Sequence, residues 1–238
     1  RASYPTVKVL ELNEGIGEAL TRTEVGVVFP CLHGPPGEDG TFQGFLEVLG
    51  IPYVGSGVLA SACAMDKRVA KQLLLANGVG VPRGHAVSRA DAAKRTASLM
   101  HALGEDLVVK PVSQGSALGT SFVTGARQLR RAIEEAFAYD ERVLIEERVR
   151  GREITVGIIE RKGIEALPVV EVLTPPGSWY DYDHRYTPGL SQHVIPATLP
   201  EAQYRRIQEL AVLAHRSLSC RDLSRVDFVV PEAGEPVV

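Results

Sequence analysis

The stretch VVKPVSQGSALGTSFV, residues 108–123, places a lysine at the end of an apolar run, then small and hydroxyl-bearing residues, then a second strand-like run. This order predicts two strands joined by a flexible loop, a hairpin that can act as a lid. It is not a Walker A loop, because Lys110 precedes the glycines. Ser113, Ser116 and Lys110 could bind phosphate together with backbone N–H groups, although a plain surface hairpin fits the stretch equally well.

Composition narrows the class of protein. A net charge of −3 and a pI near 6.1 leave no basic surplus for nucleic acid, so a small-molecule ligand is favoured. Three widely spaced cysteines without a C-x-x-C pair argue against a disulfide framework and a zinc site, and favour a reducing compartment. The uncharged stretch 48–65 contains proline and several glycines, so no membrane span is expected.

Strand-like runs alternate with helical patterns and no repeat is visible, which indicates an α/β or α+β chain. The predicted strands cover residues 25–29, 107–112, 143–146, 154–159 and 226–230. Helices are predicted from Asp66 to Gly78, from a capping box at Ser88 to Gly104, over 128–139, and over 204–218. Soft boundaries near Asp66 and Arg150 predict three lobes, 1–66, 67–150 and 151–238. The chain opens at Arg1 and stops within a strand-like run, so we expect a fragment of a longer protein.

Two further loops are candidates for ligand binding. LHGPPGEDG, residues 32–40, follows a strand-like run, where open α/β sheets place ligands, and His33 could donate to a carboxylate or phosphate. Glu38 and Asp39 are more simply first-turn residues of the helix that follows. WYDYDHRYTPG, residues 179–189, resembles a functional lid, although an exposed turn with packed tyrosines is also plausible.

Two strand-associated stretches carry charge. In LIEERVRGREITV, residues 144–156, Glu146 and Glu153 could accept hydrogen bonds from an adenine amino group and from ribose hydroxyls, or could belong to a surface ion-pair array. In SRVDFVV, residues 224–230, Arg225 and Asp227 share one face of a strand. That pair suits an oxyanion and a metal, or alternatively a salt bridge.

Taken in order, HGPPGEDGTFQG, YVGSGVLASACAMDK, VVKPVSQGSALG, EERVRGREITVGI, YDYDHRY and SRVDFVV resemble the motifs of D-alanine–D-alanine ligases of the ATP-grasp superfamily. The resemblance spans nearly the whole chain. It implies an α/β (α+β) protein with the ATP-grasp fold: an amino-terminal α/β lobe, then two ATP-grasp α+β lobes. It also implies that both ends are missing, the glycine-rich amino-terminal segment and the closing E-x-N-x-x-P-G stretch.

The resemblance assigns roles to individual residues. The nucleotide would be bound by Lys67, Lys110, Ser113, Glu146, Glu147, Val149, Glu153 and Arg185, with the two lysines on the phosphates, Glu146 at the adenine and Glu153 at the ribose. The catalytic set would be Ser116, Tyr186 and Arg225, with His33 on the substrate side and Asp227 as a magnesium ligand. Arg185 departs from the family, which commonly has lysine there.

The implied reaction is ATP-dependent ligation of two D-alanines through an acylphosphate, for peptidoglycan precursor synthesis. ATP and Mg²⁺, with Mn²⁺ as the alternative ion, would be the cofactors, and the enzyme would be a cytoplasmic homodimer. Tyr186 favours an amine nucleophile over the hydroxyl of depsipeptide-forming relatives. Two alternatives stay open: an ATP-grasp ligase for another amino acid pair, and a nucleotide-binding module without catalysis.

Overall fold

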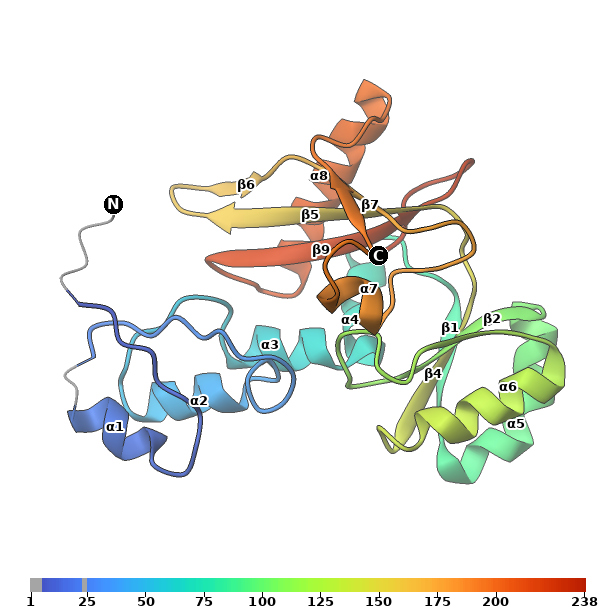
Figure 1. Cartoon of the computed structure of the whole chain (residues 1–238). Coiled ribbons are helices and arrows are strands. Elements are labelled where there is room, and N and C mark those ends of the chain that lie inside the picture. The colour runs from blue at the N-terminus through green and yellow to red at the C-terminus, as the bar shows by residue number, and fades with distance from the viewer. Residues whose placement is uncertain (1–5, 23–24) are drawn as a thin grey trace.

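The computed structural model describes residues 6–22 and 25–238, which form three regions in Figure 1. The amino-terminal region contains α1 (Ile16–Arg22), α2 (Thr41–Val48) and α3 (Val58–Met65), and α4 (Lys67–Ala76) leads out of it. The central region contains β1 (Gly84–Ser88), α5 (Arg89–Leu103), β2 (Asp106–Pro111), β3 (Ser121–Thr124), α6 (Gly125–Ala136) and β4 (Arg142–Glu147). The carboxy-terminal region contains β5 (Arg152–Glu160), β6 (Ile164–Ala166), β7 (Val170–Leu173), α7 (Tyr182–Tyr186), β8 (Gln192–Val194), α8 (Glu201–Ser217) and β9 (Leu223–Val230).

The central sheet has the strand order β1-β4-β2-β3, and its paired strands are antiparallel. The predicted hairpin of β2 and β3 is confirmed, with Asp106 opposite Thr124. Because side chains alternate along a strand, Leu107 and Val109 of β2 face the buried core under α5 and α6, whereas Lys110 points to the other face. The core therefore orients the lysine away from the helices.

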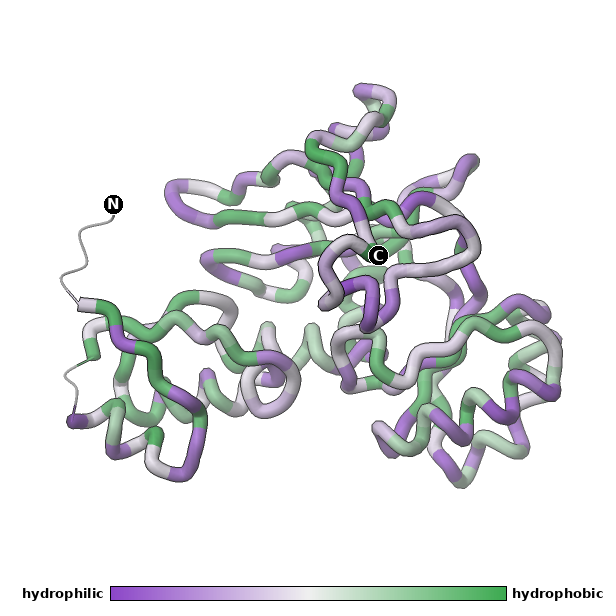
Figure 2. Tube along the Cα trace, viewed as in Figure 1, coloured by the Kyte–Doolittle hydropathy of each residue, from purple (hydrophilic) through white to green (hydrophobic). Residues whose placement is uncertain are grey.

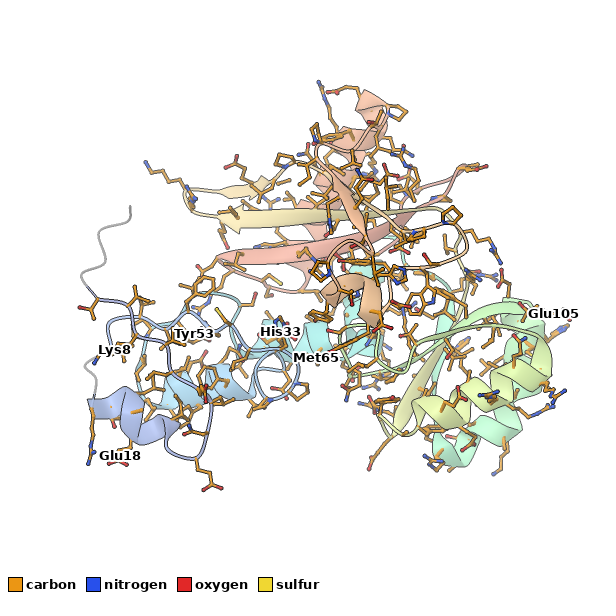
Figure 3. All side chains as sticks on the ribbon, in the orientation of Figure 1. Lys8, Glu18, His33, Tyr53, Met65 and Glu105 are labelled. Carbon is orange, nitrogen blue, oxygen red and sulfur yellow. The ribbon has the colours of Figure 1, made fainter. Side chains whose placement is uncertain are left out.

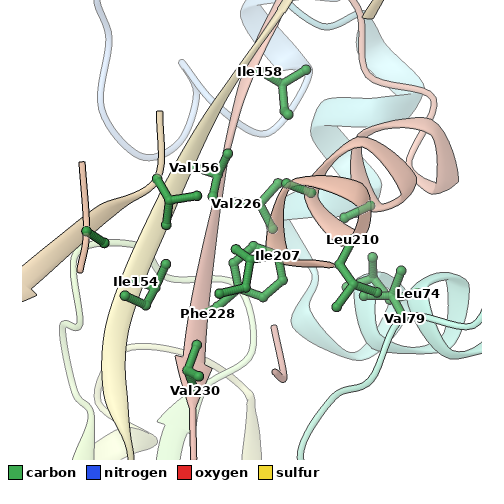
Figure 4. Close-up of a cluster of buried hydrophobic side chains, with 14 residues drawn as sticks. Leu74, Val79, Ile154, Val156, Ile158, Ile207, Leu210, Val226, Phe228 and Val230 are labelled. Carbon is green, nitrogen blue, oxygen red and sulfur yellow. The ribbon is translucent and has the colours of Figure 1, made fainter. Parts of the chain in front are cut away.

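The carboxy-terminal sheet has the order β6-β5-β7-β8, and β9 pairs with β5. One face of this sheet packs under α8, where the buried residues include Ile154, Val156, Phe228 and Ile207 (Figure 4). Leu74 of α4 joins the same cluster. The alternate residues of β5 and β9 face away from α8, which leaves the opposite face for polar side chains.

The amino-terminal region has a smaller core formed by Leu20, Phe42, Leu46 and Tyr53. The prediction of a strand over residues 25–29 is wrong. The β-pairing of this stretch consists of one isolated bridge, between Val28 and Tyr53. Apolar character alone does not make a strand, because a strand needs a partner along its length. In Figure 2 the hydrophobic colour of this region is concentrated along the chain around α2 and the loops beside it.

Capping residues and hydrophobic periodicity predicted the start of some helices correctly and of others not. Asp66 caps α4 as expected, accepting from the N–H groups of Arg68 and Val69. Ser88 precedes α5 as predicted, yet its hydroxyl donates to the Asp91 carboxylate instead of capping the helix backbone. Helix α6 starts at Gly125, three residues before the predicted start, and α3 was not predicted because its residues carry no amphipathic pattern.

Candidate functional site

Two loops from different regions meet through a pair of hydroxyls. Ser116, in the loop after β2, lies 2.8 Å from the phenolic oxygen of Tyr186 at the end of α7. Ser116 and Ala117 both adopt left-handed backbone (φ 51° and 58°), which places Ser116 at a tight turn of the loop. The ribbon in Figure 1 shows α7 between the central and carboxy-terminal sheets. The hairpin loop and α7 thus form one continuous cover.

His33 approaches this cover from the amino-terminal region. Its ring lies edge-on to that of Tyr186, with centroids 6.4 Å apart, and Figure 3 shows His33 in the part of the amino-terminal region nearest α7. Tyr186 also packs against Tyr182, at 4.8 Å between ring centroids. The side chain of Tyr186 is therefore where all three regions converge.

A buried carboxylate holds two lysines, one of them on the strand that leads into the hairpin loop. Glu146 of β4 is 2% exposed and forms ion pairs with Lys71 of α4 and with Lys110, whose Nζ lies 2.5 Å from Oε2. Burial would raise the pKa of Glu146, but the two ammonium groups outweigh it and hold the pKa below its usual value. The carboxylate is thus kept ionised between two cations.

Lys67 lies at the base of the hairpin loop. Its Nζ donates to the carbonyl oxygens of Pro111 and Val112, at 3.1 and 3.3 Å, and to that of Gln114. Burial, together with the neighbouring charge of Lys110, lowers the pKa of Lys67 to about 8. An amine held this way carries charge near neutral pH and is close to releasing it.

The face of β5 and β9 turned away from α8 carries the predicted acidic and cationic pair. Arg225 donates to both oxygens of Asp227, at 2.8 and 2.9 Å, and Thr155 donates to the same carboxylate at 2.7 Å. Burial would raise the pKa of Asp227, but Arg225 holds it below its usual value. Burial raises the pKa of Glu153 on the same face, and the Tyr180 N–H partly offsets this by donating to its carboxylate.

The other predicted nucleotide residues have partners of their own. Arg185 stacks over Tyr180 at 4.3 Å from the ring centroid, and the Ser113 N–H donates to Asp140. The carboxylate of Glu147 accepts from Arg83, at 2.7 Å from Nε. Val149 is half-buried in the connection between β4 and β5.

Two protein-family models match the chain. The model described as "D-ala D-ala ligase C-terminus" matches residues 73–238, and that described as "D-ala D-ala ligase N-terminus" matches residues 5–56. The chain belongs to the D-alanine–D-alanine ligase family. A curated D-alanine–D-alanine ligase of Geobacter sulfurreducens is 41% identical over 98% of this chain and 71% of its own length. One from Methylobacterium radiotolerans is 45% identical over 90% of this chain and 72% of its own length.

Solved structures of this ligase family superpose on the chain. The VanG D-Ala:D-Ser ligase of Enterococcus faecalis has a TM-score of 0.80 and 37% identity, over 90% of this chain and 62% of its own. The D-alanine–D-alanine ligase of Coxiella burnetii has a TM-score of 0.77 and 33% identity, over 90% and 57%. The chain thus spans less than two thirds of these solved chains. The predicted family, the ATP-grasp fold and the class of enzyme are confirmed by these matches.

Some residues of this candidate site could not be predicted from the sequence. Lys71 was missed, although it lies one helical turn after Lys67 and therefore on the same face of α4. The contact between Trp179 and Phe122 was also missed: the rings meet edge-to-face at 4.8 Å, and Arg148 covers Phe122 at 4.0 Å. Nothing local predicts the aromatic contact, because it joins β3 to a loop of the other sheet.

The residues near Asp227 can be tested for magnesium binding. Within residues 6–22 and 25–238, no group of three or more His, Cys, Asp or Glu side chains is arranged to hold a metal ion. Mg²⁺ beside a nucleotide needs only one or two carboxylates, since phosphate oxygens and waters complete its shell. Asp227 supplies one carboxylate on this face of the sheet, which fits that limited requirement. In the described residues, no helix has the length and apolar character to cross a bilayer.

Proposed function

We propose that the protein to which this chain belongs joins two D-alanines to D-alanyl-D-alanine with ATP, through an acylphosphate. The observation that carries this proposal is that the hairpin whose loop meets Tyr186 through Ser116 also carries Lys110, one of the two lysines paired with Glu146. Such a cover over a cationic site suits chemistry in which charge must be neutralised and water excluded. The family and the names of its curated relatives support the same reaction.

The nucleotide would lie between the two sheets. Lys67 and Lys110 would bind its phosphates, with backbone N–H groups of the hairpin loop and Ser113. Glu146 would accept from the adenine amino group, with Glu147 and Val149 beside it. Glu153, whose raised pKa reflects a partly desolvated carboxylate, would accept from the ribose.

Mg²⁺, or Mn²⁺ in its place, would be held by Asp227 together with phosphate oxygens, and when bound it would neutralise charge on the transferred phosphoryl group. Arg185, stacked on Tyr180, would face the phosphates as well. Arg225 donates through two of its nitrogens to the two oxygens of Asp227, and in the site with substrates bound it would turn one of these N–H groups towards the developing oxyanion.

Closing the site protects the acylphosphate. The carboxylate of the first D-alanine would receive the γ-phosphoryl group, and the amine of the second would attack the carbonyl carbon and release phosphate. His33, beside Tyr186, would contact the amino acid substrates from the amino-terminal region. A cover closed by Ser116 and Tyr186 would keep water from competing with the amine.

The proposed compartment, oligomeric state and pathway rest on the family resemblance. We propose a cytoplasmic homodimer that supplies D-alanyl-D-alanine for peptidoglycan synthesis. The reducing compartment indicated by the three free cysteines is consistent with that location.

The test is phosphate release from ATP and Mg²⁺ by the full-length protein, with D-alanine, L-alanine, D-alanine plus D-serine, and D-alanine plus D-lactate. Release with D-alanine alone, together with D-alanyl-D-alanine in the product, is the expected result. Preferential formation of D-alanyl-D-serine would instead assign D-Ala:D-Ser ligase activity, the activity in the name of the VanG structure. Binding of ATP without turnover on any substrate would leave the non-catalytic module as the better account.

A further inference from the structure

The turn between α8 and β9 makes a two-sided contact with the amino-terminal region. The N–H of Gly55 donates to the Asp222 carboxylate at 2.9 Å, and the carbonyl oxygen of Gly55 accepts from Nε of Arg221, also at 2.9 Å. Both polar groups of one loop residue are therefore bound by neighbouring side chains that lie 166 and 167 positions away in the sequence. We call this contact, formed by Gly55, Arg221 and Asp222, the Gly55 clip.

Each half of the clip is itself fixed. Asp222 has left-handed backbone (φ 60°), and its carbonyl oxygen accepts from the N–H of Glu160 at the end of β5. Asp tolerates this backbone better than most residues with a side chain. Gly55 has φ 107°, a conformation that favours glycine. Neither residue can leave its position without changing the strand or loop beside it.

The clip also reaches the core of the amino-terminal region. The guanidinium of Arg221 lies over the ring of Tyr53, 4.7 Å from its centroid, and the hydroxyl of Tyr53 donates to Glu47 of α2 at 2.7 Å. Burial, and the bond to Glu47, raise the pKa of Tyr53, so its hydroxyl stays a donor to Glu47. In Figure 3, Tyr53 lies in the part of the amino-terminal region below the start of β9.

The position of the clip links the two sides of the proposed site. Strand β9 begins one residue after Asp222 and carries Arg225 and Asp227. On the other side, the loop that carries His33 leads directly into α2, and the charge of Glu38 in that loop acts on Arg225. The distance between the amino-terminal loop and the polar face of β9 therefore depends on how the two regions are joined.

We infer that Arg221 and Asp222 are positioning residues that set the amino-terminal region against β9 and thereby form the amino acid part of the ligase site. This inference rests on the proposed function for its substrate. The lysines of the proposed nucleotide site come from α4 and β2, outside the clip. Loss of the clip weakens amino acid binding and leaves nucleotide binding intact.

The test compares Asp222→Gly with Asp222→Asn in the full-length protein. Glycine accepts the left-handed backbone but removes the carboxylate, whereas asparagine keeps both an acceptor oxygen and tolerance of that backbone. We expect Asp222→Gly to raise the KM for D-alanine by roughly 5- to 30-fold, with the KM for ATP within about twofold of wild type. Asp222→Asn restores near-wild-type values, and Arg221→Ala reproduces the glycine variant.

Ser219→Gly is the matched control, because Ser219 has left-handed backbone in the same turn (φ 55°) and is not part of the clip. Equal KM values for D-alanine in Asp222→Gly and wild type would overturn the inference, as would the same loss in Ser219→Gly or a parallel loss of ATP binding. Hydrogen exchange at the Gly55 amide gives a readout that needs no substrate, and we expect it to accelerate in Asp222→Gly only. If the wild-type protein does not ligate D-alanine, the proposed function fails, while faster Gly55 exchange still reports the clip.

Discussion

The hydroxyl groups of Ser116 and Tyr186 lie 2.8 Å apart although 70 positions separate them in the sequence. Ser116 belongs to the hairpin loop of one sheet and Tyr186 to a short helix inserted into the other. A single hydrogen bond thus joins the hairpin loop and α7 at the proposed site.

Tyr186→Phe removes this bond and keeps the ring that packs against Tyr182 and His33. We expect kcat to fall by roughly 5- to 10-fold, since one hydrogen bond contributes about 1 kcal/mol. More phosphate should be released per dipeptide formed, because the acylphosphate is less protected from water. Tyr182→Phe is the control, and equal coupling ratios in both variants and wild type would contradict the proposed role.

Lys110→Ala removes one of the two cations on Glu146 and a proposed phosphate contact. We expect the Kd for ATP, measured by calorimetry, to rise by roughly tenfold or more, as a charged hydrogen bond contributes about 1.5–3 kcal/mol. Lys94→Ala on the exposed face of α5 should leave it unchanged. An ATP affinity equal to that of wild type would remove Lys110 from the nucleotide site.

The pKa of Lys67, near 8, predicts a pH dependence of nucleotide binding. Below pH 8 the side chain is a cation, and above it the phosphate contact loses its charge. The Kd for ATP should therefore rise above pH 8, by up to roughly tenfold per pH unit. Titration of ATP from pH 7 to 9.5 measures this, and Lys67→Gln should remove the inflection.

The pH dependence of stability distinguishes weaker ATP binding at high pH from unfolding of the protein. Lys67 has a lower pKa in the folded chain than in the unfolded chain, so between about 8 and 10.5 the unfolded chain binds more protons. The contribution of Lys67 to the free energy of unfolding consequently increases with pH in that window. Weaker ATP binding that ran in parallel with a Lys67-dependent loss of stability would argue against this account.

Glu146→Ala leaves two buried ammonium groups without their shared partner. We expect the free energy of unfolding to fall by about 3–5 kcal/mol, the usual cost of breaking a buried ion pair from one side. Glu147→Ala is a close control, because the guanidinium of its partner Arg83 is exposed to solvent and water screens that ion pair, so we expect a much smaller loss. Urea unfolding of both variants measures the difference.

Phe122→Ala tests the aromatic contact between the sheets. Trp179 is the one tryptophan in the sequence, so its fluorescence reports this contact without background from other indoles. We expect the emission of the variant to shift to longer wavelength and its stability to fall by about 3–5 kcal/mol at most. Phe45→Leu, in the amino-terminal region, should not move the emission; an unshifted spectrum in Phe122→Ala would mean that the rings do not meet in solution.

Local patterns predicted the features that depend on neighbouring residues. Two apolar runs on either side of a loop rich in small and hydroxyl residues, within residues 108–123, were enough to predict the β2–β3 hairpin, and a spacing of two placed Arg225 and Asp227 on one face. Asp66 identified the start of α4 because capping is decided within three residues.

Contacts between distant segments could not be read in the same way. The pairing of Lys71 with Glu146 spans 75 positions, and neither side chain has a local feature that identifies its partner. The roles given to Ser116 and Tyr186 came from resemblance to the ligase family rather than from their own spacing. The failed strand at 25–29 has the same cause, since pairing depends on what lies beside the segment in space.

The grouping of Lys67, Lys71 and Lys110 near Glu146 makes the stability of the folded chain depend on a bound anion. Without an anion, the charge of Lys110 acts unfavourably on both Lys67 and Lys71, and burial makes that repulsion costly. A nucleotide supplies the missing negative charge, so it binds the folded chain and not the unfolded one and raises the free energy of unfolding. We therefore expect the melting temperature to climb with ATP concentration, and turnover by cellular proteases to slow while the cell is well supplied with energy.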